Sequence, residues 1–537
     1  MPDRQERSPM IKILISDKLA EEGIKILKDV KEFKVDCKFG LSPQELKAAI
    51  KDYDGLIIRS ETKVTKEVLE SADKLKVIGR AGVGLDNVDL PAATKKGVVA
   101  MNTPSGNTTS TAEHTMSMIL ALSRNIPQAC ASMRAGKWDR SKFSGVELYG
   151  KKLGVVGFGR IGSTVARFAK SFGMEVLAYD PYLSMEVAAQ KGVRMVELEE
   201  LLRESDYITL HVPKSTESKN LISEKEFQFM KKTARLINCA RGGIIDEKAL
   251  IKALEGKMIA GCALDVFEQE PLPADSPLLK LDNCIVTPHL GASTTEAQVN
   301  VAIEIAETVR DALLGKGILN AANFPSVDAE AYKVLAPYID LALRVGKFVG
   351  QLIQGRITEV KLTYRGVMTG YKVAPVTLSL VNGLLKPILG ETVNFINALD
   401  LAKERAINVQ EIISNKDEEF VNILKVEVKT DKEAFSVWGT LSGNNKPRIV
   451  RINDVYVEAS PHEYMLYINN NDKPGLIGAI GTILAGANIN IAGISLGREA
   501  QDGIAVSVVN VDSEVPESVI KKLKDTKDVL YVKLLKV

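Results

Sequence analysis

The four histidines of this chain are the first candidates for proton transfer, because imidazole is the side chain that titrates nearest neutral pH. His289, in residues 287–292, directly follows the last predicted strand of an α/β layer, where ligands collect. It is our choice of general acid/base, since one imidazole can take the hydroxyl proton of a 2-hydroxy acid that loses hydride. We interpret His114 as structural and His462 as solvated, whereas His211 could line a cofactor or simply pack.

Arg241 and Glu270 are the side chains that could work with His289. Arg241 follows another predicted strand, and its planar guanidinium can hold a carboxylate and polarise the adjacent carbonyl. Glu270 can accept the second N–H of the histidine and favour its protonated form. Each could instead form a surface salt bridge, which is a fair interpretation of Glu268. All three residues come just after strands of one predicted layer, which favours a common site.

A glycine turn at residues 157–162 follows a predicted strand and opens a helix. Gly157 and Gly159 let the backbone turn tightly and approach a pyrophosphate, and Gly162 lets the helix pack against the strand. The helix N-terminus then faces the phosphates. Asp180 closes the next strand, where it would accept the ribose hydroxyls and repel a 2′-phosphate, so we expect NAD rather than NADP. A glycine-rich turn in another α/β protein would leave Asp180 without a role.

Two α/β layers are predicted to position these groups. The first has a helix that opens at Ser42 with a capping pattern, and its predicted strands are residues 11–15, 55–58, 76–79 and 98–100. A helix over residues 109–124 leads to a second, parallel layer of six strands, which comprises residues 153–156, 174–180, 207–210, 234–238, 258–264 and 284–286. The fold class is therefore α/β, with two Rossmann-like doubly wound layers and substrate in the cleft between them.

The remainder of the chain lacks further motifs of cofactor chemistry. A middle segment, α+β in character, mixes a helix over residues 334–354 with strand-like runs at 358–364 and 423–428, and is predicted to end in the polar turn at 444–448. From Glu463 the order strand, helix, strand, strand, helix, strand indicates a small ferredoxin-like module.

Length and composition limit the class of protein. The 537 residues suffice for about three or four domains, and the net charge of +2 gives no sign of a nucleic-acid surface. The five cysteines are widely spaced, which favours free thiols in a reducing compartment. No apolar run has the length of a membrane span, and residues 1–9 lack the apolar core of a signal peptide. We expect a soluble cytoplasmic protein without a membrane partner, whose natural start could be Met10.

Taken together, the motifs resemble the D-isomer-specific 2-hydroxyacid dehydrogenases. Over about residues 11–537 the chain resembles the long members of that family, which oxidise 3-phospho-D-glycerate to 3-phosphohydroxypyruvate with NAD in the first step of the phosphorylated pathway of L-serine biosynthesis. The matching segments stand in family order: residues 79–89, 102–107, 157–162, 238–243, 264–271 and 288–292. The resemblance implies catalysis by His289, Glu270 and Arg241.

The resemblance also implies two sets of binding residues. The contacts to NAD are Val83, Gly157, Gly159, Arg160, Ile161, Gly162, Asp180, Val212, Cys239, Ala240, Arg241, Asp265, His289, Leu290, Gly291 and Ala292. The contacts to substrate are Arg59, Ser60, Arg80, Asn107 and Arg140. Because the arginines of this set join Arg241 in one cleft, they suit a substrate with a carboxylate and a phosphate better than glyoxylate or lactate.

Four domains are implied by the resemblance: residues 10–105 with 293–325 for substrate, 106–292 for NAD in a Rossmann domain, 326–460 as an intervening domain and 463–537 as an amino-acid-sensing ACT domain. Members of the family assemble into dimers or tetramers through the last two. An amino-acid effector would lie near Asn470, Asp472 and Asn490. Serine-responsive relatives tend to have histidine and asparagine at the first two positions, so we expect weak inhibition by L-serine or none.

Two other functions remain open at this point. A glyoxylate/hydroxypyruvate reductase would share the catalytic residues but has no need for the last two hundred or so residues. A transcriptional corepressor on the same fold would bind NAD as a sensor and act as a scaffold. The balanced charge and the regulatory module argue against the corepressor, and turnover would distinguish it from an enzyme.

Overall fold

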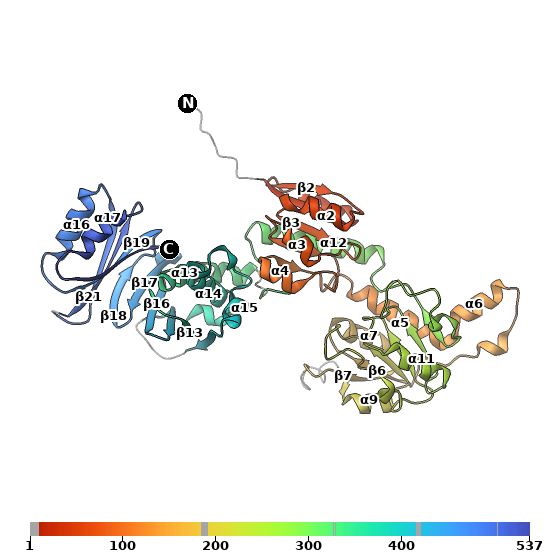
Figure 1. Cartoon of the computed structure of the whole chain (residues 1–537). Coiled ribbons are helices and arrows are strands. Elements are labelled where there is room, and N and C mark those ends of the chain that lie inside the picture. Colours follow the sequence, from red (N-terminus) through yellow and green to blue (C-terminus); the bar gives the residue numbers. More distant parts are fainter. Residues whose placement is uncertain (1–9, 184–191, 326, 328, 415–419, 502) are drawn as a thin grey trace.

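The computed structural model describes residues 10–183, 192–325, 327, 329–414, 420–501 and 503–537. The chain forms an elongated row of bodies (Figure 1). Residues 108–183 and 192–286 lie at one end of the row and residues 464–501 and 503–536 at the other, with the amino-terminal layer and the middle segment between them.

The amino-terminal layer is a parallel sheet with strand order β2-β1-β3-β4-β5. Its strands are β1 (Ile11–Ile15), β2 (Phe33–Cys37), β3 (Gly55–Ile58), β4 (Val77–Arg80) and β5 (Val99–Met101), and its helices are α1 (Glu21–Lys28), α2 (Pro43–Ala49), η1 (Ile50–Asp52), α3 (Lys66–Glu70) and α4 (Leu90–Lys96). Ser42 caps α2 in a capping box with Glu45, as the sequence predicts. Ile13 and Leu14 of β1 point into apolar cores on opposite faces, so the sheet is covered on both sides.

Helix α12 (Thr295–Leu313) returns to this layer after the chain has built the second one. A Cβ on Gly23 of α1 would lie 2.4 Å from the carbonyl oxygen of Ala302, so only glycine allows this close crossing. Further along, the amide of Ala100 donates to the Asn323 side chain at 2.9 Å. These contacts support the grouping of residues 293–325 with 10–105, whose boundaries stay predictions.

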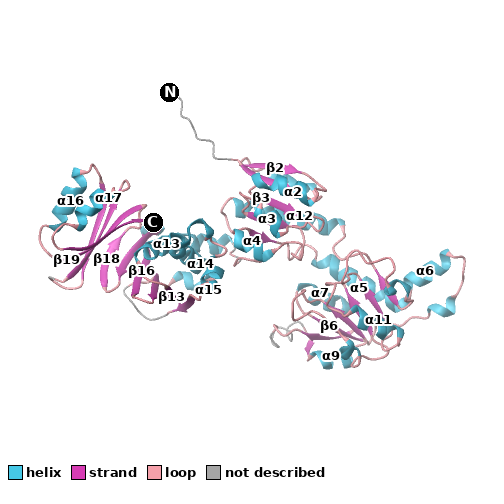
Figure 2. Cartoon of the chain, in the orientation of Figure 1, coloured by secondary structure: helices cyan, strands magenta, loops and turns pink. Residues whose placement is uncertain are grey.

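The second layer is also parallel, with strand order β12-β11-β10-β9-β6-β7-β8. Its strands are β6 (Lys152–Val156), β7 (Glu175–Tyr179), β8 (Arg194–Met195), β9 (Tyr207–Leu210), β10 (Arg235–Asn238), β11 (Gly261–Leu264) and β12 (Cys284–Val286), and its helices are α5 (Thr108–Arg124), α6 (Ile126–Arg134), η2 (Arg140–Phe143), α7 (Arg160–Ser171), α9 (Leu198–Glu204), α10 (Glu224–Phe227), α11 (Glu247–Glu255) and η3 (Pro277–Lys280). Helices α5 and α7 cover one face and α9 to α11 the other (Figure 2). The prediction of six strands was wrong, because the sheet also contains β8. This strand has only 2 residues, which is too short to give a recognisable apolar run. The strand order reverses between β6 and β9, and ligands bind at such a switch point.

The middle segment packs helices on one mixed sheet with strand order β14-β13-β15-β16-β17-β18. Its elements are α13 (Ala329–Leu352), β13 (Ile357–Arg365), η4 (Val367–Gly370), α14 (Ala374–Leu389), η5 (Gly390–Thr392), α15 (Ala398–Glu404), β14 (Asn408–Ile413), β15 (Ile423–Thr430), β16 (Ala434–Ser442), η6 (Gly443–Asn445), β17 (Lys446–Ile452) and β18 (Val455–Ala459). We predicted that the polar turn at residues 444–448 ends the segment. This prediction was wrong, because the turn leads into the return strand of a hairpin from β16 to β17.

The carboxyl-terminal module has the predicted element order β19 (Tyr464–Asn471), α16 (Leu476–Gly486), β20 (Ile491–Arg498), β21 (Ile504–Val511), α17 (Glu517–Lys524) and β22 (Val529–Lys536). The sheet order is β20-β21-β19-β22, which is the ferredoxin-like arrangement. Its helix-free face packs on α13, where Phe348 meets Tyr467 edge to face with ring centroids 6.0 Å apart. Within the described residues, no helix is long and apolar enough to cross a membrane.

Candidate active site

His289 and Glu270 form a hydrogen-bonded pair beyond the carboxyl ends of β11 and β12. The Nδ1 atom of His289 lies 2.8 Å from Oε2 of Glu270, and both side chains are partly exposed. Oε1 of Glu270 accepts the amide of Phe267 at 3.0 Å. Burial opposes ionisation of Glu270, but the hydrogen bonds from His289 and Phe267 outweigh it and hold the pKa of the carboxyl below its usual value. The Nε2 atom of His289 is therefore the nitrogen left to exchange a proton with a substrate.

The backbone of His289 has an unusual conformation. Its φ angle is 56°, in the left-handed region that a residue with a Cβ adopts at a cost. Its amide donates to the carbonyl oxygen of Thr287 at 3.0 Å, which closes a tight turn. Conformations of this kind persist where surrounding contacts enforce them, and they occur often at functional sites.

Arg241 joins the two α/β layers. Its Nε donates to Oδ2 of Asp86 at 3.1 Å, and its Nη1 donates to the carbonyl oxygen of Ala240 at 2.7 Å. A Cβ on Gly84 would lie 2.2 Å from Nη2 of Arg241, so the glycine makes room for the guanidinium. The Asn238 side chain holds the loop, because it donates to the Arg241 carbonyl and accepts from the Ala240 amide.

Arg80 and Arg59 surround the same position from the first layer. Arg80 is largely buried at the end of β4, and burial together with the nearby Arg241 lowers its pKa to about 10, with Asp86 opposing the shift and Arg59 adding to it. Arg59, Arg80 and Arg241 therefore form one group of like charges. Asp86 and Asp17 offset part of this positive charge, and the remainder favours the binding of an anion.

Asp17 organises the loop that carries Arg59 and Ser60. Its carboxylate is 3% exposed and accepts the Arg59 amide at 2.6 Å and the Thr62 amide at 3.1 Å. Asn87 donates to the carbonyl oxygen of Arg59 at 2.7 Å from the other side. Neither Asp17 nor Asp86 was predicted from the sequence to belong to the site. The available signal for Asp17 was an acid just beyond β1, at the strand end where ligands collect.

The other predicted substrate residues are less closely placed. Asn107 is the N-cap residue of α5, and its Oδ1 is buried without a partner among the described residues. Arg140 lies on η2, which follows the projecting helix α6 (Figure 1). The side chain of Arg140 is exposed.

The glycine turn after β6 has the geometry that a bound pyrophosphate requires. Gly157 has φ 90°, and a Cβ there would lie 2.6 Å from the carbonyl oxygen of His211. A Cβ on Gly162 would lie 2.1 Å from the Gly157 carbonyl oxygen, so glycine is needed for the packing of α7. Nothing lies within 4 Å of a Cβ on Gly159, which leaves open space before the N-terminus of α7. These observations fit a dinucleotide in the predicted position.

Asp180 follows β7 and faces this turn. Its Oδ2 accepts the amide of Phe158 at 2.9 Å, and its Oδ1 accepts the amide of Tyr182 at 2.9 Å. The carboxylate is thereby fixed beside the turn, with further lone pairs for the ribose hydroxyls. Of the other predicted cofactor contacts, Val212 lies against the turn, because its Cγ1 is 2.8 Å from a Cβ placed on Gly157.

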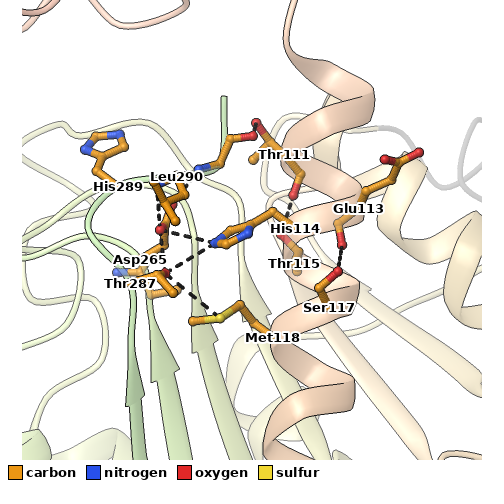
Figure 3. Close-up of polar contacts among 12 residues, drawn as sticks. Thr111, Glu113, His114, Thr115, Ser117, Met118, Asp265, Thr287, His289 and Leu290 are labelled. Atoms are coloured by element: carbon orange, nitrogen blue, oxygen red, sulfur yellow. Dashed lines mark hydrogen bonds and ion pairs between the residues drawn. The ribbon is translucent and has the colours of Figure 1, made fainter. Parts of the chain in front are cut away.

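Cys239 and Asp265 lie deeper in the layer. Burial and the charge of Asp265 raise the pKa of the Cys239 thiol to about 12, so the thiol stays protonated and is no nucleophile. Asp265 is 0% exposed, and it accepts from the Thr287 hydroxyl at 2.6 Å and from the amides of Leu290 at 2.7 Å and Gly291 at 2.8 Å (Figure 3). Burial opposes its ionisation, but these donors and His114 hold its pKa below the usual value.

The remaining histidines differ in their surroundings. The ring of His211 lies 2.9 Å from the Thr209 hydroxyl, and burial lowers its pKa to about 3, so it is neutral at physiological pH. His462 is exposed, as predicted. His114 is no simple core residue, because its Nε2 lies 3.2 Å from Oδ1 of Asp265.

In the carboxyl-terminal module the predicted effector residues already have partners within the chain. Oδ1 of Asn470 accepts the Ser507 hydroxyl at 3.1 Å, and Asp472 forms an ion pair with Arg498 at 2.8 Å. At the other end of the module, Asn490 donates to Asp512 at 2.6 Å.

Comparison with protein families agrees with this architecture. Residues 116–291 match the NAD binding domain of the D-isomer specific 2-hydroxyacid dehydrogenases. Residues 334–453 match the D-3-phosphoglycerate dehydrogenase intervening domain, and residues 464–528 match the ACT domain.

Individual relatives cover nearly the whole chain. A D-3-phosphoglycerate dehydrogenase of Methanocaldococcus jannaschii is 46% identical over 529 residues, which span 98% of this chain and 100% of that protein. The protein of the same name from Synechocystis is 44% identical over 98% of this chain and 95% of its own length. Among solved structures, a D-lactate dehydrogenase from Aquifex aeolicus complexed with NAD and lactic acid has a TM-score of 0.52 and 32% identity, and it covers 58% of this chain and 100% of its own.

The fold and the site thus define an NAD-dependent dehydrogenase of the D-isomer-specific 2-hydroxyacid class. The paired His289 and Glu270, the arginine cluster and the open glycine turn are the features of this chain that are compatible with such chemistry. Together with its intervening and ACT domains and its full-length relatives, the chain belongs to the D-3-phosphoglycerate dehydrogenase family.

Proposed function

We propose that the protein oxidises 3-phospho-D-glycerate to 3-phosphohydroxypyruvate with NAD, the entry reaction of phosphorylated L-serine biosynthesis. The observation that carries this proposal is the cluster of Arg59, Arg80 and Arg241, which suits a substrate with a carboxylate and a phosphate. Asp86 and Asp17 offset part of the positive charge, and a substrate with two anionic groups would compensate more of the remainder than one with a single carboxylate.

Three side chains act directly in the proposed oxidation. The Nε2 atom of His289 takes the C2 hydroxyl proton, because Nδ1 is engaged by Glu270. Glu270 fixes this tautomer and stabilises the imidazolium that forms. Arg241 holds the substrate carboxylate and polarises the carbonyl that develops at C2.

The remaining binding residues orient substrate and cofactor. Arg59, Ser60, Arg80, Asn107 and Arg140 are proposed to bind substrate. When bound, NAD supplies the acceptor for the C2 hydride, and Gly157, Gly159, Gly162 and Asp180 are the residues that would hold it.

The deciding assay compares substrates. NADH formation followed by absorbance should give a kcat/KM for 3-phosphoglycerate at least about tenfold above those for D-lactate and glycolate, which lack the phosphate. A higher kcat/KM for glycolate or D-glycerate would favour the reductase alternative. Tight NAD binding without turnover of any hydroxy acid would favour the scaffold.

We also propose that the ACT domain serves assembly into a dimer or tetramer, or responds to an effector other than L-serine. Asp472 is already paired with Arg498, and an ammonium ligand would have to compete for that carboxylate. Rates with and without L-serine at about millimolar levels test this expectation, and strong cooperative inhibition would contradict it.

A further inference from the structure

The loop that carries His289 is tied to one buried carboxylate. Asp265 accepts from the Thr287 hydroxyl on the amino-terminal side of His289, and from the amides of Leu290 and Gly291 on the carboxyl-terminal side. Because residues on both sides of His289 donate hydrogen bonds to Asp265, the orientation of this carboxylate determines the position of His289.

Helix α5 contacts both Asp265 and the loop that carries His289. Nε2 of His114 lies 3.2 Å from Oδ1 of Asp265 and 3.3 Å from the Thr287 hydroxyl (Figure 3). About one helical turn earlier, the Thr111 hydroxyl donates to the Gly291 carbonyl oxygen at 3.2 Å. The side chain of His114 is 18% exposed and that of Asp265 is 1% exposed, so little water reaches their contact.

The location of His114 explains why a polar ring is present on this face of α5. A carboxylate buried to this degree must be surrounded by donors, or it becomes protonated or moves. Oδ1 takes its donors from the loop and from α5, whereas Oδ2 takes the Gly291 amide. A donor on α5 therefore fixes the plane of the carboxylate relative to the helix, which the donors of the loop alone cannot do.

The backbone of His289 makes this support necessary. With φ 56° the residue is held in a conformation that is unfavourable outside its context. If the carboxylate of Asp265 were free to turn, the loop would relax and His289 would lose its alignment with Glu270.

We propose that His114 is a positioning residue, which acts through Asp265 on residues 287–291 and so holds His289 in place for proton transfer. What His289 does there rests on the proposed function. The placement of the loop by His114 does not, because it depends only on contacts within the chain.

Three substitutions at one position separate hydrogen bonding from packing. His114→Leu fills similar space without a donor. In His114→Gln the amide nitrogen reaches about as far as Nε2 of histidine, whereas in His114→Asn it reaches only about as far as Nδ1. The matched control is Ser123→Ala, which removes a buried contact of the same helix, from the Ser123 hydroxyl to the Tyr207 hydroxyl at 2.8 Å, away from the loop.

Two measurements are needed, one of which involves no substrate. Hydrogen exchange of the cofactor-free protein, resolved to residues 287–293, reports the protection of the Leu290 and Gly291 amides. Steady-state kinetics then give kcat and KM separately.

We expect His114→Leu and His114→Asn to speed exchange of this segment about tenfold and to lower kcat about tenfold, with KM for the hydroxy acid changed less than about threefold. His114→Gln should stay within about threefold of wild type in both measurements. Ser123→Ala should lower the melting temperature without changing either value.

Near-normal exchange and kcat in His114→Leu would overturn the proposal, as would a His114→Gln variant that is as impaired as His114→Leu. If His114→Leu does not fold, the contrast between His114→Gln and His114→Asn decides. Faster exchange in a protein whose wild type does not oxidise 3-phosphoglycerate would support the positioning of the loop and refute the proposed function instead.

Discussion

Replacing Glu270 by glutamine tests the proton relay most directly, because it keeps the shape of the side chain and removes its charge. Oε2 of Glu270 faces Nδ1 of His289, and Oε1 accepts the Phe267 amide. A glutamine can present its oxygen to only one of these two nitrogens. Both orientations therefore damage the site, each in a different way.

If the amide oxygen stays with Phe267, its NH2 group faces Nδ1 of His289 and forces that nitrogen to accept. The ring proton then resides on Nε2, the atom that should receive the hydroxyl proton. If the amide flips, Nδ1–H keeps its acceptor, but the NH2 group opposes the Phe267 N–H, and two donors in contact cost about 1–3 kcal/mol. In either case the imidazolium loses the negative charge beside it, and in the first orientation it also loses a charge-assisted hydrogen bond of about 1.5–3 kcal/mol.

Together these effects amount to about 3–5 kcal/mol, which corresponds to a fall in kcat of about two to four orders of magnitude. NAD binding should change little. The control is Glu268→Gln, the same substitution two residues earlier, where the carboxylate accepts the Glu247 amide and does not contact His289. A Glu270→Gln variant within about threefold of wild type, or an equal loss in Glu268→Gln, would refute the relay.

Gly162→Ala should lower both the melting temperature and NAD affinity, since its Cβ would lie 2.1 Å from the Gly157 carbonyl oxygen. Gly159→Ala should keep the melting temperature and weaken NADH binding measured by fluorescence, because its Cβ would meet no protein atom within 4 Å; equal destabilisation by both variants would contradict this. His211 has a folded pKa of about 3 and an ordinary unfolded pKa of about 6.5, so its contribution to stability is complete above the upper value and falls by up to about 1.4 kcal/mol per pH unit below it. Urea unfolding at pH 7 and pH 5 should show a weaker pH dependence in His211→Gln, and an unchanged dependence would exclude this account. Asp180→Ala should reduce the preference for NAD over NADP in kcat/KM, and a wild type that used both equally would contradict the role of Asp180.

The parts of the fold and site that the sequence predicts are those encoded within a short stretch. The glycine turn, the capping box at Ser42 and the βαββαβ order depend on neighbours in the chain, and the structure has them all. His289 and Arg241 could be found because parallel strands bring their carboxyl ends to one edge of a sheet.

The contacts between distant segments could not be predicted in this way. Asp86 of the first layer accepts a hydrogen bond from Arg241 of the second layer. The residue pattern of neither segment indicates this contact. Strand β2 alternates apolar and charged residues at a sheet edge and was not predicted, although β1 pairs with it in register. His114 was interpreted as structural because a helical pattern shows only which face of the helix a residue occupies. The pattern does not show that the buried carboxylate of Asp265 lies next to that face.

The return of α12 to the amino-terminal layer has a consequence for the order in which the protein is built on the ribosome. The hydrogen bond from Ala100 to Asn323 joins residues 223 positions apart, and α12 fills the apolar face beside Gly23 and Gly79. Until Thr295–Leu313 has left the exit tunnel, that face lacks the apolar side chains of α12, such as Ile305 and Val309. The NAD-binding layer, by contrast, is one continuous stretch that can fold as soon as it emerges. The amino-terminal layer is therefore synthesised first but completed only after the NAD-binding layer. Its completion requires the NAD-binding layer to fold quickly enough to bring residues 10–105 and α12 together.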